Sequence, residues 1–178
     1  MENILKILEC GNNEEKIKLL ETLNDTYNPE ILEKIILKLS DDDIQVRGEA
    51  FSSLVLNKNK ISDVLIKNLN SGDKNIRSFS TLVLANRNEV NSIQEIMKLA
   101  NDEHSIVRSC VIGALEFLKA QEAKEIFLES LLDSNLEVRK SALHAIINLN
   151  ITISEDRMEK IVKEKDHEME KMLSKLKK

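Results

Sequence analysis

The segment LSDDDIQVR, at positions 39–47, places three consecutive carboxylates and one guanidinium directly before an apolar run. Clustered carboxylates can bind a metal ion or move a proton, and a neighbouring Arg can keep them charged. The same residue types also cap helices and join one helix to another through charge-assisted hydrogen bonds. The segment is therefore either a site for chemistry or a structural joint.

Three further copies of this segment favour the joint. Arg47, Arg77, Arg108 and Arg139 mark the copies and are separated by 30, 31 and 31 residues. A β-branched residue precedes each Arg, an Asp or Ser stands six positions before it, and a Leu or Ile stands seven positions after it. Matching residue types at a fixed period predict an array of structural repeats and not one active centre.

Two helices are expected in each repeat unit. A short amphipathic segment precedes each acidic turn, as in PEILEKIILKL and AKEIFLESLL, and a helix of about four turns follows it. The residue four before each Arg is the expected N-cap of this second helix: Asp43, Asp73, His104 and Asn135. Because imidazole is a weaker cap than a carboxylate or an amide, the helix after His104 is the one expected to fray or shift.

The repeats divide the chain into six units within one domain. Four are clear, over residues 28–58, 59–89, 90–120 and 121–152. Residues 1–27 form a degenerate N-terminal capping repeat, and residues 153–178 form a C-terminal capping hairpin with a stripe of Met and Leu. Terminal repeats differ from inner ones because their outer faces meet water. The Met stripe is read as a cap, with a partner helix as the alternative.

The pattern D-x-D-x-x-V-R, complete in DDDIQVR, resembles the HEAT repeat. The short period is similar to that of the HEAT-like repeats of phycobilisome bilin lyases. This resemblance implies an all-α fold, a right-handed α-solenoid of about six hairpins with the second helices on its concave face. It also implies a structural ladder between units, made by Asp41, Arg47, Arg77, Asp102, Arg108, Asp133 and Arg139. Ser71 departs from the pattern, as do Cys10 and Lys16 in the first unit, so the ladder is expected to be incomplete.

Composition argues against several functional classes. The net charge of −5 and the absence of Trp oppose general binding to nucleic acid, including the mode of HEAT-like DNA glycosylases. No apolar stretch approaches the roughly 20 residues that span a bilayer. Two cysteines and no apolar run after Met1 favour a cytoplasmic setting.

Enzymatic chemistry has little support in the residues. His104 and His144 stand in different units, and His167 is the only His followed by Glu, whereas HEAT-like dimetal enzymes carry several such pairs. Cys10 and Cys110 are three units apart, which at roughly 10 Å per unit is too far for a disulfide. We therefore expect no catalytic residue, no metal and no cofactor.

The solvent-side positions of the second helices are the most informative surface. They lie one, two and five residues after each Arg, and the candidates for binding a protein are Gly48, Glu49, Ser52, Ser78, Phe79, Leu82, Ser109, Gly113, Lys140 and His144. Small residues would let a partner backbone approach, and Phe79 and Leu82 would anchor it. The alternative is that small residues only permit curvature and that Phe79 packs between units. We expect a non-enzymatic scaffold or adaptor for another protein, with a regulatory or chaperone-like enzyme subunit as the second hypothesis.

Overall fold

The computed structural model describes residues 2–163, and all regular structure within them is helical. The predicted C-terminal Met stripe lies outside these residues, as do most of the final hairpin and His167. The helices are α1 (Glu2–Cys10), α2 (Asn13–Leu20), α3 (Pro29–Leu37), α4 (Ile44–Leu56), α5 (Ser62–Asn68), α6 (Lys74–Asn86), α7 (Ile93–Met97), α8 (Ser105–Phe117), α9 (Lys124–Ser130), α10 (Leu136–Asn148) and α11 (Glu155–Lys163). The all-α prediction is confirmed.

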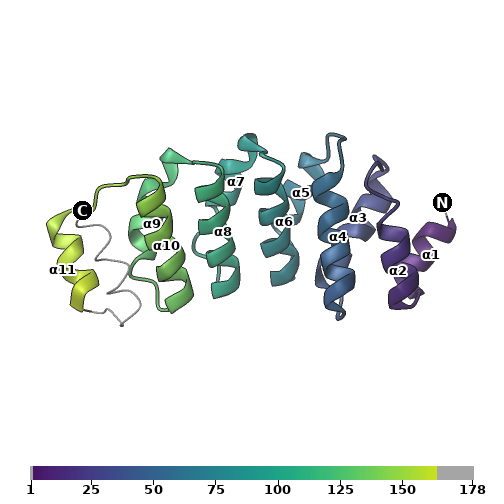
Figure 1. Ribbon diagram of the computed structural model, residues 1–178, viewed down its shortest axis with the longest axis horizontal. Coiled ribbons are helices and arrows are strands. Elements are labelled where there is room, and N and C mark those ends of the chain that lie inside the picture. Colours follow the sequence, from purple (N-terminus) through teal and green to yellow (C-terminus); the bar gives the residue numbers. More distant parts are fainter. Residues whose placement is uncertain (1, 164–178) are drawn as a thin grey trace.

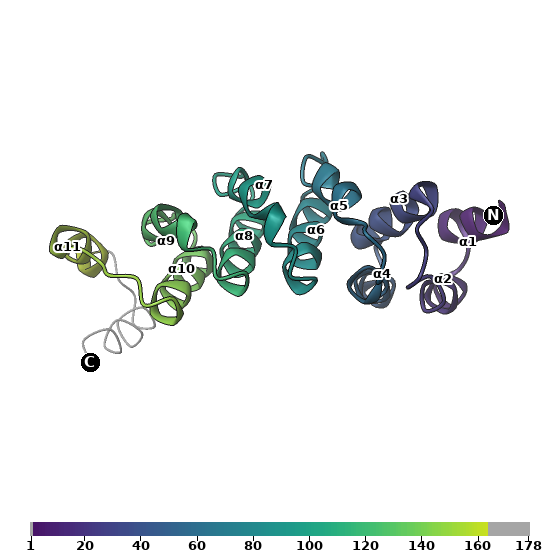
Figure 2. The same cartoon turned by 90° about the horizontal axis from the view of Figure 1, so that it is seen from above.

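The helices stack as successive hairpins into an elongated solenoid (Figure 1). The even-numbered helices form one row and the odd-numbered helices the other (Figure 2). The stack bows gently, with the even-numbered row on its inner side (Figure 2). The second helix of each unit therefore lies on the concave side, as the resemblance to HEAT repeats implies. None of the described helices has the length and apolar character needed to cross a membrane.

Side-chain caps fix where the second helices begin. Asp43, Asp73 and Asn135 each accept hydrogen bonds from the backbone N–H groups two and three residues further on. These bonds satisfy donors that have no partner inside the helix. His104 makes no such bond, yet α8 still begins at the next residue. The expected shift of this helix does not occur, because Asp102 holds the turn by accepting a hydrogen bond from the His104 backbone N–H.

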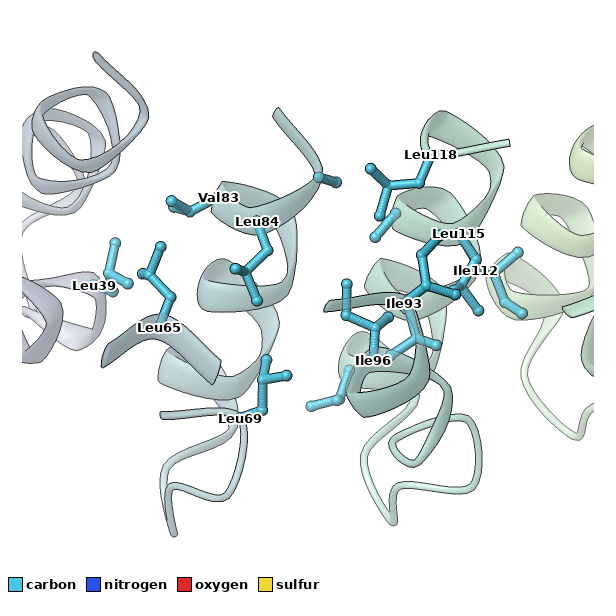
Figure 3. Packing of buried hydrophobic residues seen from close by; sticks show 14 of the residues in the cluster. Leu39, Leu65, Leu69, Val83, Leu84, Ile93, Ile96, Ile112, Leu115 and Leu118 are labelled. Atoms are coloured by element: carbon cyan, nitrogen blue, oxygen red, sulfur yellow. The ribbon is translucent and has the colours of Figure 1, made fainter. Parts of the chain in front are cut away.

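The hydrophobic core runs along the whole stack between the two rows. At the position before each Arg the side chain is buried, and at the position seven after it the side chain is fully buried: Val46, Ile76, Val107, Val138, then Leu54, Leu84, Leu115 and Ile146. Figure 3 shows Leu65 of α5, Leu69 directly after α5, Leu84 of α6, Ile96 of α7 and Leu115 of α8 in this layer between the rows. Burial at a fixed offset in every unit makes the core a continuous strip, as in repeat proteins generally.

Candidate functional site

The four anchoring arginines share one contact within their own unit. Each donates from Nη1 to the backbone carbonyl six residues before it, over 2.7 or 2.8 Å. This bond ties the start of the second helix to the turn in front of it. The Arg is therefore part of the turn in every unit, whatever else it contacts.

Within residues 2–163, Arg77 and Arg108 also reach forward to the Asp of the next unit. Arg77 binds Asp102 with two parallel hydrogen bonds of 2.8 and 3.0 Å, and Arg108 binds Asp133 in the same way, at 2.7 and 2.8 Å. Two-point contacts of this kind are the stronger class of ion pair. These side chains are largely buried, so the predicted ladder is present here as well-formed rungs.

The rungs hold their carboxylates in the charged form. Hydrogen bonds from Arg108 lower the pKa of Asp133 more than burial raises it. Burial raises the pKa of Asp102, but the hydrogen bonds from Arg77 and from the His104 backbone together lower that pKa by more, so the net shift is downward. A carboxylate held in this way is a poor proton donor near neutral pH. Asp102 and Asp133 are therefore held as charged ion-pair partners of the two arginines.

Lys16 supplies a rung that the sequence comparison left open. Its ammonium lies 3.0 Å from the Asp41 carboxylate, 25 residues ahead, the same separation as in the two arginine rungs. Lys38 approaches the same carboxylate at 3.4 Å. The first unit therefore joins the ladder even though its signature has degenerated.

The ladder is interrupted between α4 and α6. Ser71 occupies the Asp position, and Arg47 forms no ion pair with any residue in the described range. The link between units here is a hydrogen bond without an ion pair, in which the Ser40 hydroxyl donates to the Asp73 carboxylate over 2.7 Å. Ser71 still accepts a hydrogen bond from the Asp73 backbone N–H. Ser71 therefore keeps the hydrogen bond that forms the turn, but it cannot form an ion pair with Arg47.

Arg87 makes a second joint that the sequence analysis missed. It lies just after α6 and donates to three backbone carbonyls in the last turn of α4 and in the loop that follows α4: Leu54, Asn57 and Asn59. Ten residues after the anchoring Arg, the four units carry Asn57, Arg87, Leu118 and Leu149. Two polar residues in a column of core leucines were the signal that could have identified this contact.

The inner face exposes most of the predicted binding residues. Gly48 and His144 are exposed, and seven others are half-buried: Glu49, Ser52, Phe79, Leu82, Ser109, Gly113 and Lys140. Ser78 differs from the prediction, because its side chain is only 2% exposed and cannot form part of the surface. A Cβ added to Gly48 or Gly113 would meet nothing within 4 Å, so the surface is open above both glycines.

Local contacts divide this face into parts of different character. The ring of Phe79 meets Phe51 of α4 edge to face, with centroids 6.3 Å apart. Phe79 is therefore partly packed between units, as the alternative prediction has it, and partly exposed. Beyond Gly113, Glu116 binds His144 and Asn148 of α10. The centre is therefore apolar and small, and its C-terminal side is polar and internally paired.

The Cys110 thiol and a cleft between α7 and α9 are two further features that bear on chemistry. Burial raises the pKa of the Cys110 thiol, which therefore stays protonated and weakly nucleophilic at neutral pH. A cleft of about 450 Å³ lies on the other side of the solenoid, lined in part by Met97, Ala100 and Ile126. No group of three or more metal-ligating side chains comes together within residues 2–163.

Comparison with known proteins identifies the repeats. Residues 62–147 match the model for HEAT repeats, and residues 26–47 match the model for the HEAT repeat associated with sister chromatid cohesion. HEAT repeats are thus detected across the central units. Neither model concerns bilin lyases, and that finer resemblance receives no support. No protein with a curated description matches the chain.

Solved structures of repeat proteins share the fold. An engineered protein superimposes with a TM-score of 0.56 at 17% identity, covering 98% of this chain and 94% of its own. The designed armadillo repeat protein YIII(Dq)4CqI gives 0.56 at 15% identity and 98% of both chains. The designed armadillo repeat protein YIII(Dq.V1)4CPAF, in complex with the peptide (KR)4, gives 0.55 at 15% identity, with 96% of this chain and 95% of its own. At these identities the likeness defines an α-solenoid fold.

Proposed function

We propose that this protein is a non-enzymatic interaction scaffold or adaptor that binds a segment of another protein along the inner face of α4, α6 and α8. The observation that carries the proposal is the separation of roles on the second helices. The ladder residues form hydrogen bonds and ion pairs within and between units. Gly48 and Gly113 face open space, and Phe79 and Leu82 are only partly buried. An open helix face of small and apolar residues suits a peptide or helix.

The fold itself supports a peptide ligand. A designed armadillo protein of the same architecture is in complex with a peptide, (KR)4. A stacked array offers a long continuous surface with equivalent positions in each unit, which matches the regular spacing of an extended chain. Both described cysteines are free thiols, in line with the proposed cytoplasmic setting.

The proposal is tested by blocking the floor of the face. Gly113→Arg places a long side chain in open space and replaces the least favourable non-proline residue of a helix interior, so the fold is expected to be retained. Phe79→Ala/Leu82→Ala removes the apolar anchors. Leu37→Ala/Leu132→Ala is the matched control, because it removes two exposed leucines at the ends of first helices α3 and α9.

Tagged proteins are used to capture partners from cell extract, and the captured proteins are identified by mass spectrometry. We expect the wild type and the control to capture the same partner and both inner-face variants to lose it. Circular dichroism checks that each variant is folded. Capture of an unchanged set by folded Gly113→Arg protein would rule out the inner face as the binding surface.

A further inference from the structure

The acids of the second helices fall into two groups. Most have a partner of their own: Glu14 pairs with Lys18, Glu15 accepts from the Asn12 backbone, Glu116 binds His144 and Asn148, and Glu137 pairs with Lys140. Glu21 and Glu49 are different. Neither forms an ion pair or a hydrogen bond through its carboxylate within the part of the chain that the structure describes.

These two acids occupy inner-face positions of adjacent units. Glu21 lies five residues after Lys16, as Leu82 lies five after Arg77, and Glu49 lies two residues after Arg47, as Phe79 lies two after Arg77. They are carried by the C-terminal end of α2 and by α4, which pack against each other. The acidic pair therefore continues the apolar centre of the same surface toward the N-terminus.

The pair is electrostatically unfavourable in the free protein. Burial raises the pKa of the Glu49 carboxyl, and the charge of Glu21 raises it further. Two neighbouring like charges, of which Glu49 is partly buried and Glu21 is exposed, cost free energy when no cation pairs with either. A cationic group placed there would remove the repulsion and form two charge-assisted contacts. One unit further along, the corresponding positions are Ser52 and Phe79, so the charge is confined to one end of the face.

We propose that the bound segment carries a Lys or Arg that binds between Glu21 and Glu49, and an apolar side chain that contacts Phe79 and Leu82. This inference rests on the proposed function and specifies the chemistry of the partner. Stacked units lie about 10 Å apart, and an extended chain advances about 3.3 Å per residue. The basic and the apolar residue are then about three to six positions apart in the partner.

The test uses a displayed library of random dodecapeptides selected on the 178-residue chain. Enriched peptides are expected to share a basic residue and an apolar residue at this spacing. In fluorescence anisotropy, Glu21→Gln/Glu49→Gln should lower the affinity for an enriched peptide about tenfold or more, and added salt should weaken binding to the wild type. The matched control is Glu14→Gln/Glu137→Gln, which changes two second-helix acids that already have partners and should leave the affinity unchanged.

The melting temperature distinguishes acids that bind a partner from acids that stabilise the fold. Because the substitution removes a repulsion, Glu21→Gln/Glu49→Gln should melt at the same temperature as the wild type or higher, while it loses affinity. A lower melting temperature would make the acids structural and overturn the inference.

Other outcomes separate this inference from the proposed function. Enriched peptides that lack a basic residue, or that bind the Glu21→Gln/Glu49→Gln variant as well as the wild type, overturn the charge assignment. If Gly113→Arg still abolishes their binding, the inner face stands as a binding surface. A wild-type dimer that dissociates in the Glu21→Gln/Glu49→Gln variant would assign the acids to a second copy and overturn the inference. Failure of the wild type to enrich any peptide counts against both proposals.

Discussion

The joint between α4 and α6 and the joint between α6 and α8 connect similar helices by different means. At the α6–α8 joint a buried Arg77–Asp102 pair links the N-terminal ends, and the two helices pack along their length. At the α4–α6 joint Ser71 replaces the Asp, and the helices meet over a shorter stretch. A contact between Phe51 and Phe79 fills part of the space between them.

At the C-terminal ends of these helices, it is the α4–α6 joint that has the additional contact. Three second helices end in a residue with positive φ, eleven positions after the anchoring Arg: Asn88, Lys119 and Asn150. In this conformation the backbone N–H of the following residue donates to the carbonyl five residues before it, which closes the helix. Helix α4 ends instead in an extended Asn57, and Arg87 binds the carbonyls at that end.

The two joints show that the D-x-D-x-x-V-R motif forms the turn and couples neighbouring units through separate contacts. Ser71 is enough for the turn, because an oxygen that accepts from Asp73 N–H is all that the turn requires. Coupling to the preceding unit needs a charged, two-point partner for Arg. The α4–α6 joint is thus tied mainly at its C-terminal end, through Arg87, and the α6–α8 joint at its N-terminal end.

Breaking the intact rung should have the largest effect. Asp102→Asn removes the charge that pairs with Arg77, whose side chain is largely buried, and leaves a guanidinium without a counter-ion. We expect the free energy of unfolding to fall by about 2–3 kcal/mol in urea denaturation at pH 7. Asp42→Asn, an exposed acid of the equivalent turn before α4, is the control and should change it by less than about 0.5 kcal/mol.

The effect of Asp102→Asn should depend on pH in one direction. The folded-state pKa of Asp102 lies below its ordinary value, so the rung contributes its full stability above the ordinary pKa. That contribution is lost as the pH falls through the lowered folded-state value. Wild type and variant should therefore converge in acid, and a difference that persists there would mean that the rung charge is not the cause.

Removing the clamp at the other joint should have the second-largest effect. Arg87→Leu gives α6 the residue type that α8 and α10 have at this position, but it leaves the carbonyls of Leu54, Asn57 and Asn59 without their donor. We expect a loss of about 1–2 kcal/mol. Arg87→Lys should lie between the two, since one ammonium cannot replace a planar guanidinium. Faster hydrogen exchange should appear first at the end of α4, and an equal increase in α8 would contradict a local role.

Restoring the missing rung should have the smallest effect, and it should be favourable. Ser71→Asp offers Arg47 the carboxylate that Arg77 and Arg108 already have, and the Asp side chain can keep the turn hydrogen bond. We expect a gain of about 1 kcal/mol in the free energy of unfolding, since the pair would be only partly buried. Ser71→Asn, which keeps the turn without the charge, is the control. No gain for Ser71→Asp over Ser71→Asn would mean that α4 and α6 stand too far apart for a rung.

Much of the fold could be predicted from residue types at fixed offsets. The caps at Asp43, Asp73 and Asn135, and the fully buried Leu54, Leu84 and Leu115, follow from local geometry within one unit, where helical phase relates position to direction. The shorter spacing of 30 residues after Arg47 also marked the unit whose second helix ends differently. Its meaning could not be inferred without the structure.

The candidate site was predicted less completely. Phe79, Leu82 and Gly113 are partly exposed, as a binding surface requires, whereas Ser78 is buried and cannot belong to it. The unpaired state of Glu21 and Glu49 was not visible in the sequence, because every acid looks equally free until its neighbours in the next unit are known.

The period, the caps at Asp43, Asp73 and Asn135, and the core strip could be predicted from the sequence alone, because each depends on contacts within about one unit. Only the tertiary structure shows that Arg77 and Arg108 pair with the next unit and that Lys16 pairs with Asp41 in place of an Arg. It also shows that Arg87 links α6 to the C-terminal end of α4, where the ion pair at the N-terminal end is missing, and which inner-face side chains stay exposed. These contacts depend on the distance and rotation between stacked helices, which are set by the packing of many side chains together and not by any single residue type.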